Sequence, residues 1–325
     1  MAGVTLVESM VVLGVFSLLV LTFFKSVIMV QDGNTMMGHH NRVNTKCQRV
    51  LNHLVTKVSS SVRLYGENSE GRLLLNTLEG VSTEILPDSK LPVLLPDGIV
   101  EKDPENERST GNCLLFIQAD TPYGYKAEGG TEDFIRIDVY RIVAVYLKRK
   151  PGVVGSLEKR PDGLELAMFK SVPLLDFGQV SAVENDEEKE RLLRQARTER
   201  GIDYLFDKNE VVSRALRTFD LQGVLNPNLP DPYVILADSE EGQKDILADT
   251  SISVATNGAP EQYGVARFAW RSIEGAGFPH GLEARIIGGA GARQILLHLT
   301  LVMRSKPTCD LAYADLHSMA VARDY

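Results

Sequence analysis

The first thirty residues of the chain carry the feature that most constrains its fold. Residues 4–30 are almost continuously apolar, and the only charged side chains among them are Glu8 and Lys25. A helix needs about 20 such residues to cross the hydrocarbon core of a bilayer. A carboxylate at the edge of such a segment is costly to insert into lipid, so we expect it to have a purpose. The sequence therefore predicts a membrane-spanning helix in which Glu8 has a special role.

Two other interpretations of this segment are open. A secretory signal peptide starts with basic residues, continues with roughly 7–15 apolar residues and ends at a small-residue cleavage site. Here no basic residue precedes Met10, and no Ala-x-Ala pattern follows Phe24. A generic single-pass anchor fits the length of the segment but leaves Gly3 and Glu8 without an explanation.

The run Gly3-Val4-Thr5-Leu6-Val7-Glu8, with the apolar segment directly behind it, resembles the prepilin motif of type IV pilins and type II secretion pseudopilins. In that family a membrane peptidase cuts after the glycine, the new N-terminus is methylated, and the glutamate at the fifth mature position assists assembly. The resemblance implies a short leader over residues 1–3, cleavage between Gly3 and Val4, and methylation of Val4. It also implies that Glu8 is the assembly residue.

An assembly role for Glu8 has a physical basis in charge pairing between subunits. We expect Glu8 to be unpaired within one subunit, whereas the terminal ammonium of a neighbouring subunit supplies a partner in a bundle of helices. Pairing relieves much of the cost of placing a charge in a medium of low dielectric constant. Each subunit is then expected to dock at a set axial offset.

The helical pattern continues beyond the membrane-length segment. Apolar residues recur in steps of three and four residues, at Val43, Cys47, Val50, Leu54, Val58 and Val62. Such spacing places them on one helix face. Glycine costs about 1 kcal/mol relative to alanine inside a helix, so Gly33 and Gly38 predict a weak point near 31–38. We predict one helix over 4–64, with a transmembrane stalk at 4–30 and an amphipathic part at 31–64.

Residues 65–325 are expected to form a β-rich globular head. The fold class is therefore α+β, with a long N-terminal pilin-type helix packed on a large antiparallel β-rich head. Alternating apolar residues and β-branched or aromatic composition predict strands at 73–75, 113–118, 134–147, 164–172, 233–236, 265–270 and 294–303. Acids at the start, Arg197 and Arg200 at the end and a following glycine predict a surface helix at 186–200. Four prolines predict an extended insertion at 86–111.

Net charge and cysteine content limit the kinds of partner that the chain is expected to bind and the disulfides that it can form. The net charge of −8 argues against broad nucleic-acid binding, which favours a basic surface. The membrane segment is expected to place the head in the oxidising periplasm of a bacterium. Three cysteines allow one disulfide and a leftover thiol. Cys113 opens one predicted strand and Cys309 follows another, which favours this pair. Three buried, reduced thiols are an equal alternative.

A search for chemistry yields few candidates. The chain has no Gly-x-Ser-x-Gly elbow, no His-Glu-x-x-His pair and no Cys-x-x-Cys pair. The glycine-rich run 288–291 precedes a predicted strand, so it is interpreted as a turn rather than a phosphate loop. Residues 207–210 are similar to a calcium loop but lack its glycine and its distal glutamate. We therefore predict no catalytic residues, no cofactor and no metal ligands.

The order of elements resembles that of J-type minor pseudopilins and PilW-type minor pilins. The shared features are the long N-terminal helix, a long central strand that ends in the basic run 148–150, and a late strand. The resemblance implies a structural subunit at the tip or in the initiation complex of a pilus or pseudopilus. Its implied partners are other minor pilins, the major pilin, the prepilin peptidase and the bacterial inner membrane. A pilus-displayed adhesin or ligand-binding module is one alternative, and a membrane-anchored periplasmic enzyme is the other.

Overall fold

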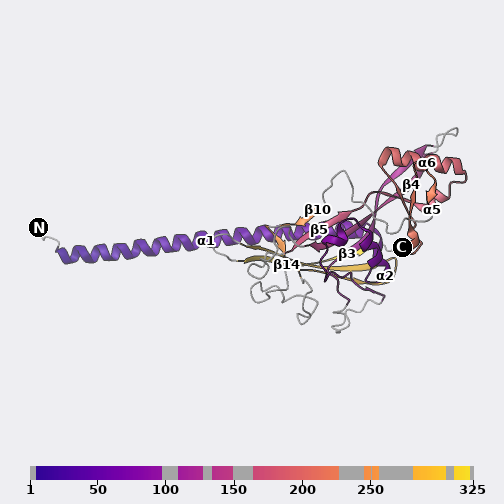
Figure 1. The fold of residues 1–325 in the computed structure, drawn as a ribbon. Helices are drawn as coiled ribbons and strands as arrows, with labels where there is room; N and C mark the ends of the chain where they lie inside the picture. The colour runs from indigo at the N-terminus through magenta and orange to yellow at the C-terminus, as the bar shows by residue number, and fades with distance from the viewer. Residues whose placement is uncertain are drawn as a thin grey trace.

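The chain folds into an elongated, sheet-rich head from which one long helix projects (Figure 1). The computed structural model describes residues 5–96, 109–126, 134–148, 164–226, 245–249, 251–255, 281–304 and 311–322. The N-terminus lies at the free end of the helix, far from the head (Figure 1). The α+β fold class predicted from the sequence is confirmed.

Helix α1 covers Leu6–Ser59, a span of 54 residues without a break. The predicted weak point near 31–38 is not there, because Gly33 and Gly38 are both helical. Their cost of about 1 kcal/mol each falls in the middle of a long helix, where each added residue is stabilised by its neighbours on both sides.

The predicted end of the helix at residue 64 is wrong by five residues. After Ser59 the chain turns directly into strand β1, Ser61–Tyr65, which pairs antiparallel with β3. Val62 continues the helical spacing of apolar residues, but it lies within β1, where the register with β3 shifts between Ser61 and Arg63. The periodic pattern therefore ran past the true helix end by one step.

The described residues of the head form two sheets. The first holds β1, β3 (Leu114–Lys126), β4 (Phe134–Lys148), β5 (Glu165–Lys170), β6 (Leu174–Asp176), β7 (Tyr204–Phe206), β8 (Leu216–Phe219), β9 (Leu225–Asn226) and β10 (Asp245–Ala248). The second holds β2 (Leu94–Leu95), β11 (Ser253–Val254), β12 (Leu282–Ile287), β13 (Arg293–Arg304) and β14 (Leu311–Ala322). Pairing is antiparallel except for β6 with β7 and β12 with β2. We expected an antiparallel head, but the strand pairing is mixed, with two parallel pairs.

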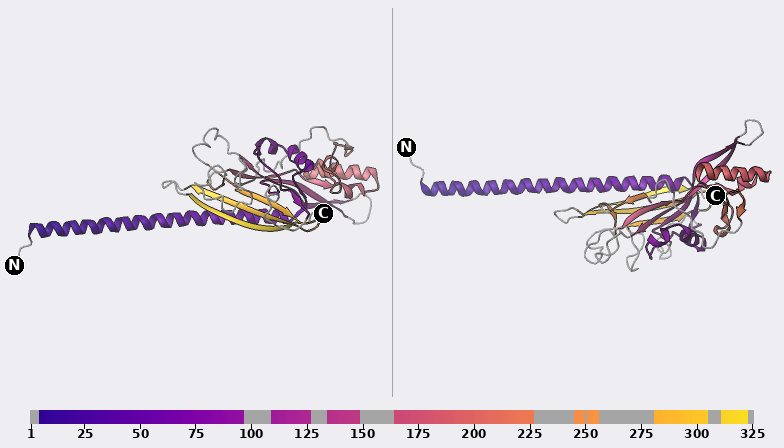
Figure 2. Two further views of the ribbon diagram at one scale, coloured as in Figure 1. Left: turned by 90° about the horizontal axis from the view of Figure 1, so that it is seen from below. Right: turned by 45° about the horizontal axis from the view of Figure 1, so that its top comes forward.

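Helix α1 packs its apolar stripe onto the second sheet. The buried members of the stripe are Val43, Cys47, Val50, Leu51, Leu54 and Val58. They share one core with alternate residues of β12, β13 and β14 and with one face of β3, β4 and β5. Figure 2 shows β13 and β14 running alongside the head half of α1. The amphipathic part of the predicted helix is thus confirmed as a core element.

Strand β4 is buried on both faces, which explains its nearly continuous apolar sequence. Val143, Val145 and Leu147 face the core that contains α1. Ile142 and Tyr146 face a second core that includes helices α2 (Ser69–Thr77) and α7 (Val212–Ala215). The first sheet is therefore the middle layer of the head.

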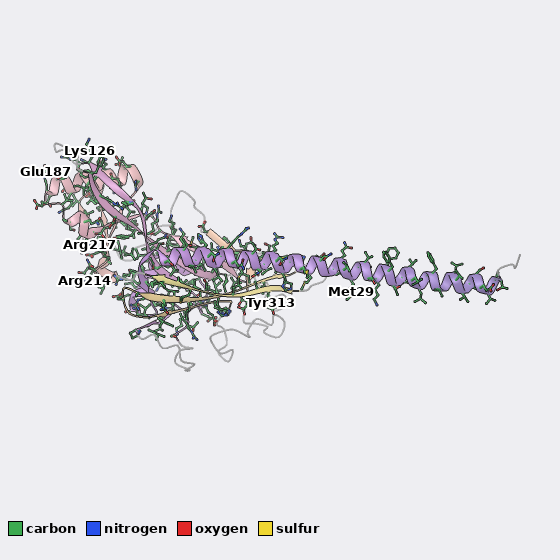
Figure 3. All side chains as sticks on the ribbon, turned by 180° about the vertical axis from the view of Figure 1, so that it is seen from behind. Met29, Lys126, Glu187, Arg214, Arg217 and Tyr313 are labelled. Carbon is green, nitrogen blue, oxygen red and sulfur yellow. The ribbon has the colours of Figure 1, made fainter. Side chains whose placement is uncertain are left out.

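A third core lies at the end of the head that is farthest from the projecting part of α1 (Figure 1). The outer halves of β3 and β4 meet helices α5 (Phe177–Ser181) and α6 (Asp186–Arg200) there. The predicted bounds of α6 are confirmed. The Asn185 side chain accepts from the Glu187 N–H at its start, and Gly201 ends it with a φ of +62°. Figure 3 shows Lys126 and Glu187 at this outer end.

The outcomes for the remaining predicted elements are mixed. Strands at 113–118, 134–147, 164–172 and 294–303 are confirmed as β3, β4, β5 and β13. The predicted strand at 73–75 is wrong, because α2 covers it. Asn68 caps that helix by accepting from the Gly71 N–H at 2.8 Å, and leucine is a strong helix former. Strands predicted at 233–236 and 265–270 lie outside the described residues. Residues 97–108 of the proline-rich insertion 86–111 also lie outside the described residues. The described part of the insertion contributes β2, and the short helix α3 (Val81–Glu84) precedes it.

Replacing a side chain of the packed stripe tests the role of α1 in the head core. Leu54 is 0% exposed, whereas Met37 on the same helix is 70% exposed. We expect Leu54→Ala to lower the free energy of unfolding of the head by about 2–5 kcal/mol, because it leaves a cavity. Met37→Ala is the control and should change it by less than about 0.5 kcal/mol. Denaturant titration of the full chain in detergent measures both, and equal effects of the two changes would contradict the packing.

Candidate functional site

The first candidate site is the projecting segment of α1, defined here as residues 6–35. Apart from Val20, its large apolar side chains up to Val30 are 45–79% exposed. Figure 3 shows these side chains standing out around the helix, with Met29 labelled among them. The helix is long and apolar enough to cross a membrane, and none of its most apolar stretch is buried in the head. This segment is therefore compatible with a single-pass membrane anchor.

Glu8 lies in the first turn of the projecting segment and closes a capping box with Thr5. The Thr5 N–H donates to Glu8 Oε2 at 2.8 Å, and the Thr5 hydroxyl donates to the same oxygen at 3.0 Å. The Glu8 N–H donates back to Thr5 Oγ1 at 3.4 Å. Glu8 is therefore hydrogen-bonded within the chain, a contact that the sequence analysis did not expect. A Thr-x-x-Glu run before an apolar segment is the sequence signature of this cap.

The capping box leaves the charge of Glu8 in place. Its hydrogen-bond donors, an amide and a hydroxyl, are both neutral. Within the part of the chain that the structure describes, no cationic side chain bonds to it. Glu8 therefore has a structural role at the helix start and retains a negative charge for a further partner. Gly3 and Val4, the predicted processing residues, lie outside the described residues, so their roles stay predictions.

The thiols of Cys47 and Cys113 are both free and buried. The predicted disulfide between Cys113 and Cys309 is therefore not formed at Cys113, and Cys309 lies outside the described residues. Burial raises the pKa of each thiol to about 12. Cys47 also donates to the Leu299 carbonyl oxygen at 3.4 Å, which joins α1 to β13. The alternative of buried, reduced thiols fits these two residues.

The second candidate site is a histidine cluster on the face of the second sheet opposite the α1 core. It consists of Glu283 on β12, His298 and Thr300 on β13, and Asp315 and His317 on β14. The register pairs Glu283 with His298, His298 with His317, and Thr300 with Asp315. Because side chains alternate along a strand, these five residues share one face, while neighbours such as Leu297 and Leu299 face the core.

His298 is held between two carboxylates. Its Nδ1 lies 2.8 Å from Glu283 Oε2, and its Nε2 lies 2.5 Å from Asp315 Oδ1. The Thr300 hydroxyl donates to the same Asp315 oxygen at 3.1 Å. The ring of His317 stacks on that of His298, with centroids 4.3 Å apart and planes 9° from parallel. Glu283, His298 and Thr300 are 0% exposed, whereas His317 is exposed.

The electrostatics of the cluster follow from this arrangement. Burial lowers the pKa of His298, but the hydrogen bonds and charges of Asp315 and Glu283 outweigh it and raise that pKa to about 9. Burial and the neighbouring charge of His298 lower the pKa of His317. His298 is therefore cationic at neutral pH, and His317 is the neutral imidazole of the pair.

In the strand predicted at 294–303, alternation puts His298 and Thr300 on the face opposite Leu297, Leu299 and Leu301, but the other three residues of the cluster were not expected. The available signal was a set of polar side chains within otherwise apolar, alternating strands. The pairing register that brings Glu283, Asp315 and His317 together is a long-range property, which strand patterns do not specify. The sequence predicts no metal ligands, but this cluster contains three residues of ligating types. Ligand atoms of His298, Asp315 and His317 all lie within 4.8 Å of one another.

Two loops with some likeness to ligand-binding motifs have structural roles. The glycine-rich run 288–291 is the turn between β12 and β13, as predicted, and Gly288 and Gly291 have φ values of +104° and +94°. In the loop 207–210, Arg63 donates to the carbonyl oxygens of Lys208 at 3.2 Å and Glu210 at 2.8 Å. An arginine thus occupies carbonyl groups that a calcium ion would need.

Alkylation tests the state of the two buried thiols. Because the thiolate is the reactive form and the pKa of both groups is about 12, we expect iodoacetamide at pH 7.5 to leave Cys47 and Cys113 unmodified in the folded chain. Both should react fully in denaturant without prior reduction. Peptide mass mapping measures this, and a Cys113–Cys309 peptide in the unreduced digest would contradict it.

No protein-family model, curated protein or solved structure matches this chain. Two features of the molecule bear on its function, the projecting segment and the histidine cluster. The projecting segment exposes apolar side chains that lipid or another protein would cover. The histidine cluster gathers charged side chains and metal-ligand atoms in the head.

Proposed function

We propose that this chain is a membrane-anchored filament subunit of the type IV pilin or type II secretion pseudopilin class. In this proposal it is cut after Gly3, methylated on Val4 and assembled through α1. The observation that carries the proposal is the division of one continuous helix into two parts. Residues 6–35 project from the head and are largely apolar up to Val30, whereas the stripe from Val43 to Val58 is part of the head core.

The projecting segment supports both stages of such a life cycle. At 1.5 Å per residue, residues 6–30 extend about 37 Å, compared with a hydrocarbon thickness of about 30 Å. Apolar side chains surround this segment, so water is an unfavourable environment for every side of it. Lipid covers such a helix before assembly, and the helices of neighbouring subunits cover it afterwards.

Glu8 supports a specific docking step rather than simple anchoring. Its cap with Thr5 uses neutral donors, so its charge is available to a cation from another chain. The terminal ammonium of a processed neighbour is such a cation, and it would be created by the cleavage itself. A charge pair in an apolar bundle has a steep distance dependence, which sets the axial offset between subunits.

The size of the head favours a place at the tip or in an initiation complex. A bulky head is difficult to repeat along a tightly packed shaft. In this proposal the partners are other minor pilins and the major pilin, the processing enzyme is the prepilin peptidase, and the head lies in the periplasm before assembly. The chain then acts as a structural subunit and not as an enzyme.

The N-terminus of the mature protein tests the processing step. We expect the protein isolated from its native membrane to begin at N-methylated Val4, because cleavage after Gly3 creates the ammonium that pairs with Glu8. Intact-mass measurement and N-terminal peptide mapping decide this. A chain that retains Met1, or one that is cut after residue 24, would overturn the proposal.

Substitution of Glu8 separates its two roles. Glutamine also serves at this position of a capping box, so Glu8→Gln keeps the cap and removes the charge. We expect Glu8→Gln to lower the fraction of the chain in sheared filaments more than about tenfold, because loss of one partner of a buried charge pair costs about 2–5 kcal/mol. Quantitative immunoblotting of filament and membrane fractions measures this.

The matched control is Asp32→Asn, which removes the other carboxylate of α1. It should leave the filament fraction unchanged. Circular dichroism of the purified variants confirms that the helix content is equal. Assembly of Glu8→Gln at the wild-type level would show that Glu8 only caps the helix.

A further inference from the structure

We infer that His298, Asp315 and His317 form a binding site for a divalent transition metal ion, with Zn²⁺ as its expected occupant. The inference concerns the head alone and is independent of the proposed function of α1. It rests on the geometry of the three ligands and on the groups that orient them.

The pairing of β13 with β14 brings the three ligands together. His298 lies directly opposite His317, and Asp315 lies two residues before His317 on the same face. Directly opposite residues on antiparallel strands have Cβ atoms about 4.5–5.5 Å apart. The ligand atoms of the three side chains all lie within 4.8 Å of one another. Zinc bonds of about 2.0–2.2 Å to nitrogen and oxygen place ligand atoms roughly 3.3 Å apart. To close the site, the exposed His317 ring has to turn out of its stack on His298, and the Asp315 carboxylate has to move away from His298 Nε2.

Two groups behind the ligands orient them. Glu283 is 0% exposed and accepts from His298 Nδ1 at 2.8 Å. With that proton fixed on Nδ1, Nε2 is the ring nitrogen that faces Asp315. Thr300 donates to Asp315 Oδ1 at 3.1 Å and holds the carboxylate in place. A carboxylate that orients a metal-binding histidine is a recurring feature of zinc sites, and such supporting partners tune the affinity for the metal.

The donor set selects the class of metal. Two imidazoles and one carboxylate suit zinc and neighbouring transition metals, whereas calcium and magnesium favour oxygen ligands. His317 is exposed, so the ion has access from solvent. Its fourth position is open to water or to a group from a partner.

Calorimetry on the full chain in detergent tests the site. The protein, without an affinity tag, is stripped with EDTA, dialysed and titrated with ZnCl₂ at pH 7.5. We expect one saturable zinc ion per chain. His317→Gln should weaken binding at least about 100-fold, because it removes a ligand on an exposed side chain. Thr300→Val should weaken it about 10–100-fold, as expected for a supporting partner.

His53→Gln is the matched control, because His53 lies on α1 outside the cluster and is half-buried. It should leave zinc binding unchanged. Titration of the wild-type chain with CoCl₂ gives a second readout, since tetrahedral cobalt has strong visible absorption bands that octahedral cobalt lacks. Thermal unfolding of each variant checks that it is folded.

Two results would overturn the inference. One is the absence of saturable zinc binding to the wild-type chain. The other is zinc binding that His317→Gln and Thr300→Val leave unchanged. In either case the cluster is a histidinium held between two carboxylates, with a role in the stability of the sheet alone.

Discussion

The contact between the second half of α1 and the strands β13 and β14 is the interaction on which the rest of the structure depends. It buries the stripe from Val43 to Val58 in the same core as both sheets. Because a helix is rigid over this length, the contact also determines where residues 6–35 point. The same residues that stabilise the head therefore hold an apolar rod away from it, where lipid or other helices can cover it.

Much of this arrangement is local in sequence and was predictable. The apolar periodicity of α1, the alternation in β13 and the caps of α6 are set by neighbouring residues, and the structure contains all three. The failures come from competition between local and long-range effects. The 73–75 run is apolar enough for a strand, but the Asn68 cap makes it part of a helix. Val62 keeps the helical spacing, but pairing of β1 with β3 draws it into the sheet.

The candidate sites divide in the same way. Glu8 was recognisable from its position next to the apolar segment, although its partner Thr5 was overlooked. The histidine cluster was not recognisable, because its residues come from three strands whose register is set by the whole sheet. A single residue of slip in β14 would send Asp315 and His317 to the core side. The polar face of this sheet is therefore a consequence of correct folding rather than of any local motif.

The unbroken path of α1 through Gly33 and Gly38 has a mechanical consequence. Fifty-four residues in one helix make a lever about 81 Å long at 1.5 Å per residue. A pull along its free end does not peel the head away residue by residue, because the buried stripe lies parallel to the load. All of the stripe's side chains resist together in shear, because they share one core with both sheets.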